Sequence, residues 1–176
     1  PDLKDRCLVV NGLSKAYCMP GWRLGYAAGP EELIKAMFKI QSQSTSGATH
    51  FCQWAGVVAL TGDHSFIPVH NESFRQRRDL VVSLVRQISG LSCTSPQGAI
   101  YCYIGCSDYI GRKTPGGAAI STDEDLVRYL LEEAGVAAIP GTPFGMSPFF
   151  RVSFATAMPK IKTALERTQT ALNALR

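Results

Sequence analysis

The sequence predicts an α/β protein whose second half is an α+β layer, a small mixed sheet covered by helices. Two observations support this class. Short apolar runs of strand length alternate along the chain with longer segments that carry apolar residues at helical spacing. The composition, 45 % apolar and 18 % charged over 176 residues, is typical of a chain that folds around a core, as one ordinary domain or two small ones.

The first 62 residues combine two predicted strands with two predicted helices. The strands are the apolar runs 7–10 and 22–28, each short enough to be buried. Gly29-Pro30 then precedes a helical pattern, and proline is tolerated in the first turn of a helix. After a polar interruption, a second and mostly apolar helix is expected over 51–60, ending at Gly62.

The remaining chain predicts three helices around short strands. Apolar residues spaced by three, four and seven indicate a long amphipathic helix between residues 74 and 88. Ser121 with Glu124 suggests a capping box that opens a second helix, closed by Gly135, and Pro159 starts a final one. Strands are expected over 99–104, 136–139 and 150–154, with an exposed loop over 111–118.

Charge, hydropathy and cysteine usage exclude several classes of function. The net charge of +4 is too small and too dispersed to indicate a nucleic-acid or membrane partner, and no run of about 18 apolar residues could span a membrane. The six cysteines include no C-x-x-C pair, and the chain begins at Pro1 without a targeting segment, so we expect reduced thiols in a cytoplasmic protein. The three histidines lack a completing ligand set, so no metal is expected.

Two cations near the start of the chain have a pattern of chemical interest. Lys15 follows the first predicted strand, and Arg23 stands at the start of the second. An amine partly buried among apolar neighbours has a lowered pKa, which suits imine chemistry, and a guanidinium fork at the same pocket can hold a phosphate. A solvated loop lysine and an arginine in a surface ion pair are the alternative interpretations.

Two sequence motifs give these cations a family context. Ser14-Lys15 followed by Gly-Trp-Arg-Leu-Gly-Tyr at 21–26 resembles the cofactor-lysine motif of class I/II aminotransferases, the fold-type I pyridoxal-phosphate enzymes. Pro-Gly-Thr-Pro-Phe-Gly at 140–145 and Phe-Arg-Val-Ser-Phe-Ala at 150–155 resemble the C-terminal signature of the same family, in the same order. Within the family, the chain looks most like prokaryotic aspartate aminotransferases.

The resemblance covers essentially the whole chain but only the last part of a family member. It therefore implies a C-terminal fragment of a fold-type I enzyme, containing the last strands of the large domain and the small domain. Residues 1–28 would end the large cofactor-binding domain, 29–62 would form connecting helices, and 63–176 would form the small C-terminal domain.

The resemblance also implies roles for three residues. Lys15 would bond covalently to pyridoxal 5'-phosphate and move a proton between the substrate and cofactor carbons. Arg23 would bind the cofactor phosphate, and Arg151 would bind the substrate α-carboxylate. The planar guanidinium of arginine matches a planar carboxylate better than the ammonium group of lysine does. Many family members have a phosphate-contacting serine where this chain has Gly12, so the phosphate site depends more on Arg23 or on backbone N–H groups.

The implied activity is amino-group transfer between an amino acid, aspartate or a similar acidic or aromatic one, and a 2-oxo acid such as 2-oxoglutarate. The parent enzyme would be a cytoplasmic homodimer. Because the family supplies other parts of the active site from residues before its lysine, the isolated 176 residues are expected to be inactive. Two alternatives stay open: an aminotransferase-like ligand-sensing domain of a transcription regulator, and a pyridoxal-phosphate lyase or synthase of the same fold.

Overall fold

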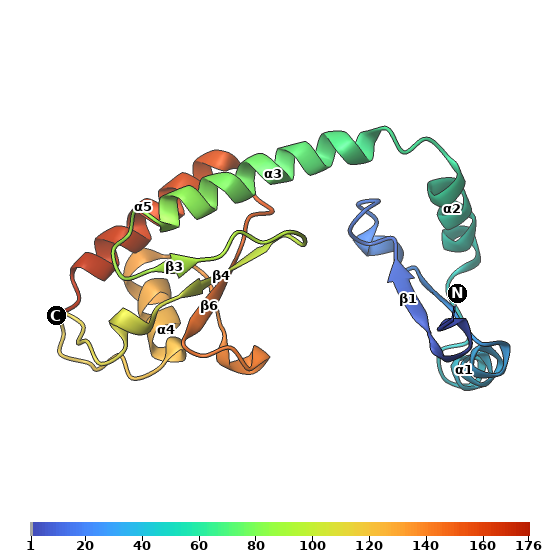
Figure 1. The fold of residues 1–176 in the computed structure, drawn as a ribbon, viewed down its shortest axis with the longest axis horizontal. Helices are drawn as coiled ribbons and strands as arrows, with labels where there is room; N and C mark the ends of the chain where they lie inside the picture. Colours follow the sequence, from blue (N-terminus) through green and yellow to red (C-terminus); the bar gives the residue numbers. More distant parts are fainter. Residues whose placement is uncertain (1) are drawn as a thin grey trace. The chain divides into compact units, whose positions relative to one another are not determined.

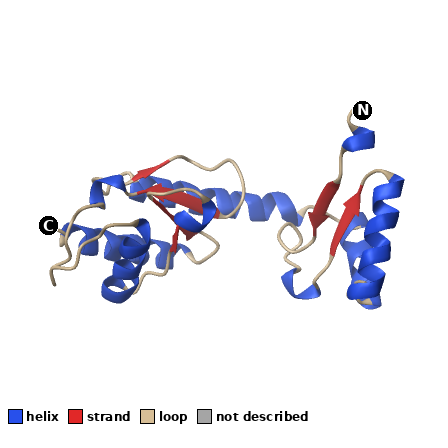
Figure 2. Cartoon of the chain, turned by 90° about the horizontal axis from the view of Figure 1, so that it is seen from below, coloured by secondary structure: helices blue, strands red, loops and turns tan. Residues whose placement is uncertain are grey.

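The computed structural model describes residues 2–176, which form two compact units, one extending to Val69 and the other from His70 to Arg176. The division falls inside a long helix, α3 (Phe66–Val85), which can be followed along the chain in Figures 1 and 2. Within residues 2–176, no helix has the length and apolar character that crossing a bilayer requires. The three-part division at residues 28 and 62 stays a prediction.

The first unit contains the two strands and two helices that the sequence predicts. Its elements are a 3₁₀ turn (Lys4–Arg6), β1 (Val9–Gly12), a second 3₁₀ turn (Pro20–Trp22), β2 (Gly25–Ala28), α1 (Glu31–Ser44) and α2 (His50–Thr61). The strands pair antiparallel, from Val9 opposite Ala28 to Gly12 opposite Gly25. The second strand starts later than predicted, because Arg23 has a left-handed backbone (φ 51°) that a strand does not accept.

A small packed region lies where α2 meets the connection between β1 and β2. Leu13 is buried there, and a Cβ atom placed on Gly56 would come within 2.4 Å of Leu24 Cδ2. The expected burial of the first strand is wrong for the chain described here: Val10 is 71 % exposed. Among residues 2–176, β1 and β2 pair only with each other, so their apolar side chains have little cover.

The second unit is a four-stranded sheet with three helices. Its elements after α3 are β3 (Ser92–Cys93), β4 (Tyr101–Gly105), a 3₁₀ turn (Ser107–Tyr109), α4 (Asp123–Ala134), β5 (Ile139–Pro140), a further 3₁₀ turn (Thr142–Phe144), β6 (Phe149–Ser153) and α5 (Met158–Asn173). The strand order is β3-β4-β6-β5. The small helix-covered sheet is thus confirmed, although each neighbouring pair runs antiparallel rather than in the mixed pattern expected.

The two faces of this sheet differ in what they carry. Cys102 and Ile104 of β4 and Phe150 of β6 are buried in one core cluster with residues of α3, α4 and α5. Because side chains alternate along a strand, Tyr101 and Arg151 fall on the opposite face. The side chains on that face are only half-buried, so its polar groups can be reached by a ligand.

Two local predictions in this unit are wrong by a few residues. The capping box of α4 is formed by Thr122 and Asp125, not by Ser121 and Glu124: the Thr122 hydroxyl accepts a hydrogen bond from Asp125 N at 3.1 Å, and the Asp125 carboxylate accepts one from Thr122 N at 3.0 Å. Both pairs have the required spacing, and Thr122 has the extended backbone of an N-cap. The predicted strand 136–139 is reduced to β5, while Gly135 ends α4 as predicted, in the left-handed region.

One carboxylate, at the start of α4, is completely buried. Asp123 accepts hydrogen bonds from Thr142 N at 2.8 Å, Thr142 Oγ1 at 2.7 Å and Ser147 Oγ at 2.9 Å. Burial alone would raise the pKa of Asp123, but these hydrogen bonds outweigh it and hold the pKa below its usual 3.8. The positive end of the α4 dipole favours the same charged form. Asp123 therefore ties the turn that contains Thr142 to the helix.

We predict that Asp123→Asn lowers the free energy of unfolding at pH 7 by about 2–3 kcal/mol, because buried donors lose a charged acceptor. Since the pKa of Asp123 is depressed by folding, its stabilisation is present above the unfolded pKa and is lost as the pH falls through the lower folded pKa. The difference between wild type and variant, measured by urea unfolding from pH 7 downward, should therefore shrink below about pH 4.

The exposed neighbour Glu124 provides the control, since Glu124→Gln should change the stability little at any pH. A loss for Asp123→Asn that stays the same at every pH would contradict the role of the charge.

Candidate active site

The connection between β1 and β2 holds two of the three predicted site residues. The strand ladder ends at Gly12 opposite Gly25, and Leu13 N then donates to Leu24 O at 3.2 Å. Lys15 lies in the turn that follows, where Cys18 N donates to Lys15 O at 3.2 Å. Lys15 and Arg23 are therefore carried by one chain segment whose two ends are joined by a strand pair.

Arg23 lies on the wall of a cavity of about 530 Å³. Its side chain donates from Nη1 to Pro20 O at 2.9 Å, which leaves most of its N–H groups for other acceptors. The lining also includes Gly47, Ala48 and Thr49, and Thr49 is the N-cap of α2. A left-handed backbone is uncommon for arginine, and such conformations cluster at functional sites. Arg23 thus meets the geometric expectation of an anion-binding residue.

Lys15 is exposed, so the partial burial expected of its amine is wrong for this chain. Of the apolar neighbours in sequence, Leu13 is buried but faces α2, and Trp22 is itself 42 % exposed. Trp22 instead makes an edge contact with Phe51 of α2, with ring centroids 6.3 Å apart. These residues therefore leave the amine open to solvent.

Arg151 is held between two aromatic rings. It stands on β6 opposite Tyr103, and its guanidinium carbon lies 4.4 Å from the centre of the Tyr101 ring and 4.5 Å from that of Phe144. Within residues 2–176, no carboxylate pairs with it and its guanidinium donates no hydrogen bond. Stacking orients a guanidinium through its faces and leaves the N–H edge unused. Arg151 is therefore a preorganised cation without an anionic partner among these residues.

Sequence reasoning missed the residues that orient Arg151. Phe144 belongs to the 3₁₀ turn Thr142–Phe144, which Asp123 ties to α4 through Thr142. Phe144 also makes an edge contact with Tyr103, with ring centroids 6.0 Å apart. The Pro-Gly-Thr-Pro-Phe-Gly motif was a signal for this turn, whereas nothing in the sequence pairs Tyr101 with Arg151.

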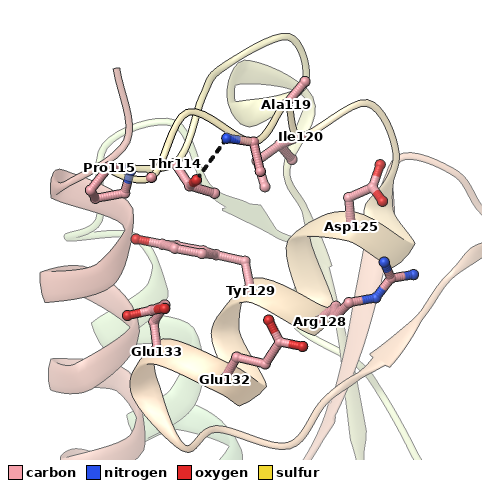
Figure 3. A pocket seen from close by; sticks show the side chains of 11 residues that line it. Thr114, Pro115, Ala119, Ile120, Asp125, Arg128, Tyr129, Glu132 and Glu133 are labelled. Atoms are coloured by element: carbon pink, nitrogen blue, oxygen red, sulfur yellow. Dashed lines mark hydrogen bonds between the residues drawn. The ribbon is translucent and has the colours of Figure 1, made fainter.

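A further cavity, of about 450 Å³, lies between α4 and the loop 114–120 (Figure 3). Two of its polar groups hold the fold: Thr114 Oγ1 accepts a hydrogen bond from Ala118 N at 3.1 Å, and the Tyr129 hydroxyl donates one to Ala171 O at 2.9 Å. None of the three predicted site residues lines it. The candidate site is therefore not here.

Comparison with known proteins agrees with these features. The family model described as aminotransferase class I and II matches residues 2–167. An aspartate aminotransferase of Rhizobium meliloti is 53 % identical over 175 residues, which is 99 % of this chain and 43 % of that protein. An aspartate/prephenate aminotransferase of Cereibacter sphaeroides is 51 % identical over 169 residues, 96 % of this chain and 42 % of its own length.

Solved structures give the same result. The crystal structure of the aspartate aminotransferase from Rhizobium meliloti superposes with a TM-score of 0.97 at 53 % identity, covering 100 % of this chain and 44 % of that one. An aromatic aminotransferase from Pyrococcus horikoshii superposes with a TM-score of 0.88 at 32 % identity, covering 98 % and 44 %.

The fold and the motifs define a fold-type I transferase. The chain belongs to the class I and II aminotransferase family. It spans less than half the length of the curated relatives it matches.

Proposed function

We propose that this chain carries the cofactor lysine and two anion-binding arginines of an aminotransferase dependent on pyridoxal 5'-phosphate. The reaction would move the amino group between aspartate and 2-oxoglutarate. The observation that carries the proposal is the β1–β2 connection, which bears Lys15 and Arg23 together. Two relatives are named aspartate aminotransferase and aspartate/prephenate aminotransferase; these names support the substrate class and make prephenate a second candidate amino acceptor.

The residues of the first unit fit the cofactor. Lys15 offers an exposed amine, and the cavity beside Arg23 offers guanidinium N–H groups next to the N-terminus of α2, an arrangement that suits a phosphate. When bound, pyridoxal phosphate supplies the electron sink that stabilises negative charge at the substrate α-carbon. In this proposal Lys15 holds the cofactor and moves the α-carbon proton, while Arg23 anchors the phosphate.

Arg151 is proposed to bind the α-carboxylate of the substrate. Its guanidinium carbon lies 4.4 and 4.5 Å from the ring centres of Tyr101 and Phe144, which hold it in place. The edge of the fork is then available for two parallel hydrogen bonds to a carboxylate, and no ion pair within residues 2–176 has to be broken first. Such preorganisation lowers the entropy lost on binding.

We further propose that the whole protein is a cytoplasmic homodimer that takes amino acids and 2-oxo acids as substrates. In support, α2 exposes the apolar side chains of Phe51, Trp54 and Val58, each more than 60 % accessible, which is a large apolar surface for one helix.

Borohydride reduction of the full-length protein with pyridoxal phosphate tests the proposal. We expect a cofactor adduct on the peptide that contains Lys15, because the imine nitrogen is fixed covalently when it is reduced. Lys15→Ala should abolish the adduct, whereas Lys35→Ala should not, since Lys35 is an exposed lysine paired with Glu31 at 2.6 Å. An adduct on another lysine, or none, would overturn the assignment.

Arg151→Lys should lower kcat/KM for the amino acid by roughly 10- to 100-fold, the loss of one charge-assisted fork. The measurement is the steady-state rate of the full-length protein with aspartate. Arg167→Lys, on the exposed face of α5, is the matched control and should change the rate little. Equal rates for Arg151→Lys and wild type would rule out carboxylate binding by Arg151.

A further inference from the structure

Two thiols meet at the β3–β4 edge of the second unit's sheet. Cys93 of β3 is paired with Ile104 of β4, and Cys102 stands two residues before Ile104 on the same strand. Residues that are paired, or two apart from a pair, share one face of a sheet and reach each other across the ladder. The Cys93 and Cys102 side chains therefore lie on one face as diagonal neighbours, and the Cys93 thiol donates a hydrogen bond to Thr94 O at 3.4 Å.

The two thiols differ in access and in acidity. Cys93 is half-buried, whereas Cys102 has no exposed surface. The neighbouring Cys102 thiol lowers the pKa of Cys93; burial opposes this, and the charge of Arg86 adds to the lowering. The neighbouring Cys93 thiol, together with burial, raises the pKa of Cys102. Cys93 is therefore the more accessible and the more acidic of the two thiols, and its thiolate is the form that reacts.

We propose that Cys93 and Cys102 form a peroxide-sensitive pair that closes reversibly to a disulfide. Diagonal neighbours lie somewhat farther apart than the Cα separation of about 4.4–6.8 Å that a disulfide needs, so one strand has to shift. β3 is suited to this, because it has two residues and pairs with β4 on one side only. The proposal does not rest on the aminotransferase activity.

The chemistry takes two steps with hydrogen peroxide as the oxidant. First, the Cys93 thiolate attacks one peroxide oxygen: an S–O bond forms, the O–O bond breaks, and hydroxide leaves and takes a proton from solvent. Cys93 is then a sulfenic acid, oxidised by the two electrons that the peroxide gained. Second, the Cys102 sulfur attacks Cys93: the S–S bond forms, the S–O bond breaks, and the leaving hydroxide takes the Cys102 proton. Two thiols and one peroxide give one disulfide and two waters.

Peptide mapping of the oxidised chain tests this directly. The reduced 176-residue chain is treated with hydrogen peroxide, remaining thiols are blocked, and the protein is cleaved with chymotrypsin under non-reducing conditions. Trypsin would leave Cys93 and Cys102 in one peptide, because no Lys or Arg lies between Arg86 and Arg112, whereas chymotrypsin cleaves after Tyr101. We expect the Cys93–Cys102 linked peptide to exceed any other linked pair roughly tenfold, as intramolecular closure predicts, and dithiothreitol to reverse it.

Variants separate the two steps. Cys102→Ser removes the second thiol, so Cys93 should accumulate as a sulfenic acid that dimedone traps, and Cys93→Ser should give neither product. Cys7→Ser removes an exposed thiol outside the pair and should leave the linked peptide unchanged. If a cysteine variant fails to fold, the wild-type map still decides: Cys93 left as a free thiol while Cys7 is oxidised, or Cys93 linked to another cysteine, would overturn the proposal.

Discussion

The antiparallel pairing of β1 with β2 is the constraint on which the candidate cofactor site depends. Four residue pairs end at Gly12 opposite Gly25, and the backbone hydrogen bond from Leu13 to Leu24 extends the contact by one step. Because both ends of the connecting segment are fixed, Lys15 and Arg23 cannot move apart freely. A slip of one residue in this register would turn every side chain of one strand to the other face. The ladder therefore holds both ends of the segment that carries Lys15 and Arg23, of which only Arg23 lines the cavity.

In the second unit, the buried carboxylate of Asp123 holds the turn that positions Phe144 beside Arg151. Asp123 is costly to bury as an anion, and three hydrogen bonds from Thr142 and Ser147 offset that cost. The turn that it holds presents Phe144 to the guanidinium, and β4 presents Tyr101 to the same group. A network around Asp123 thus orients a cation with which Asp123 makes no hydrogen bond or ion pair.

Sequence reasoning predicted the features that local chemistry determines. The helices follow from apolar spacing and from glycine and proline at their ends, and Lys15, Arg23 and Arg151 were selected by short motifs. The buried Asp123 was not predictable, because Thr142 and Ser147 lie 19 and 24 residues away in the chain. The contact of Tyr101 with Arg151 was not predictable either, because the two residues meet only after β4 pairs with β6. The expected burial of Lys15 was wrong for a related reason: burial depends on which surfaces pack together, and neighbours in sequence do not determine that.

The most direct test of the central claim is the affinity of the full-length protein for pyridoxal phosphate when Arg23 is replaced. If the β1–β2 pairing brings Arg23 to the cofactor phosphate, Arg23→Gln should weaken binding roughly 10- to 100-fold, the effect of losing a charged hydrogen-bond donor. Arg167→Gln on α5 removes the same charge and should leave the affinity unchanged. Equal affinities for Arg23→Gln and the unaltered protein would contradict the account.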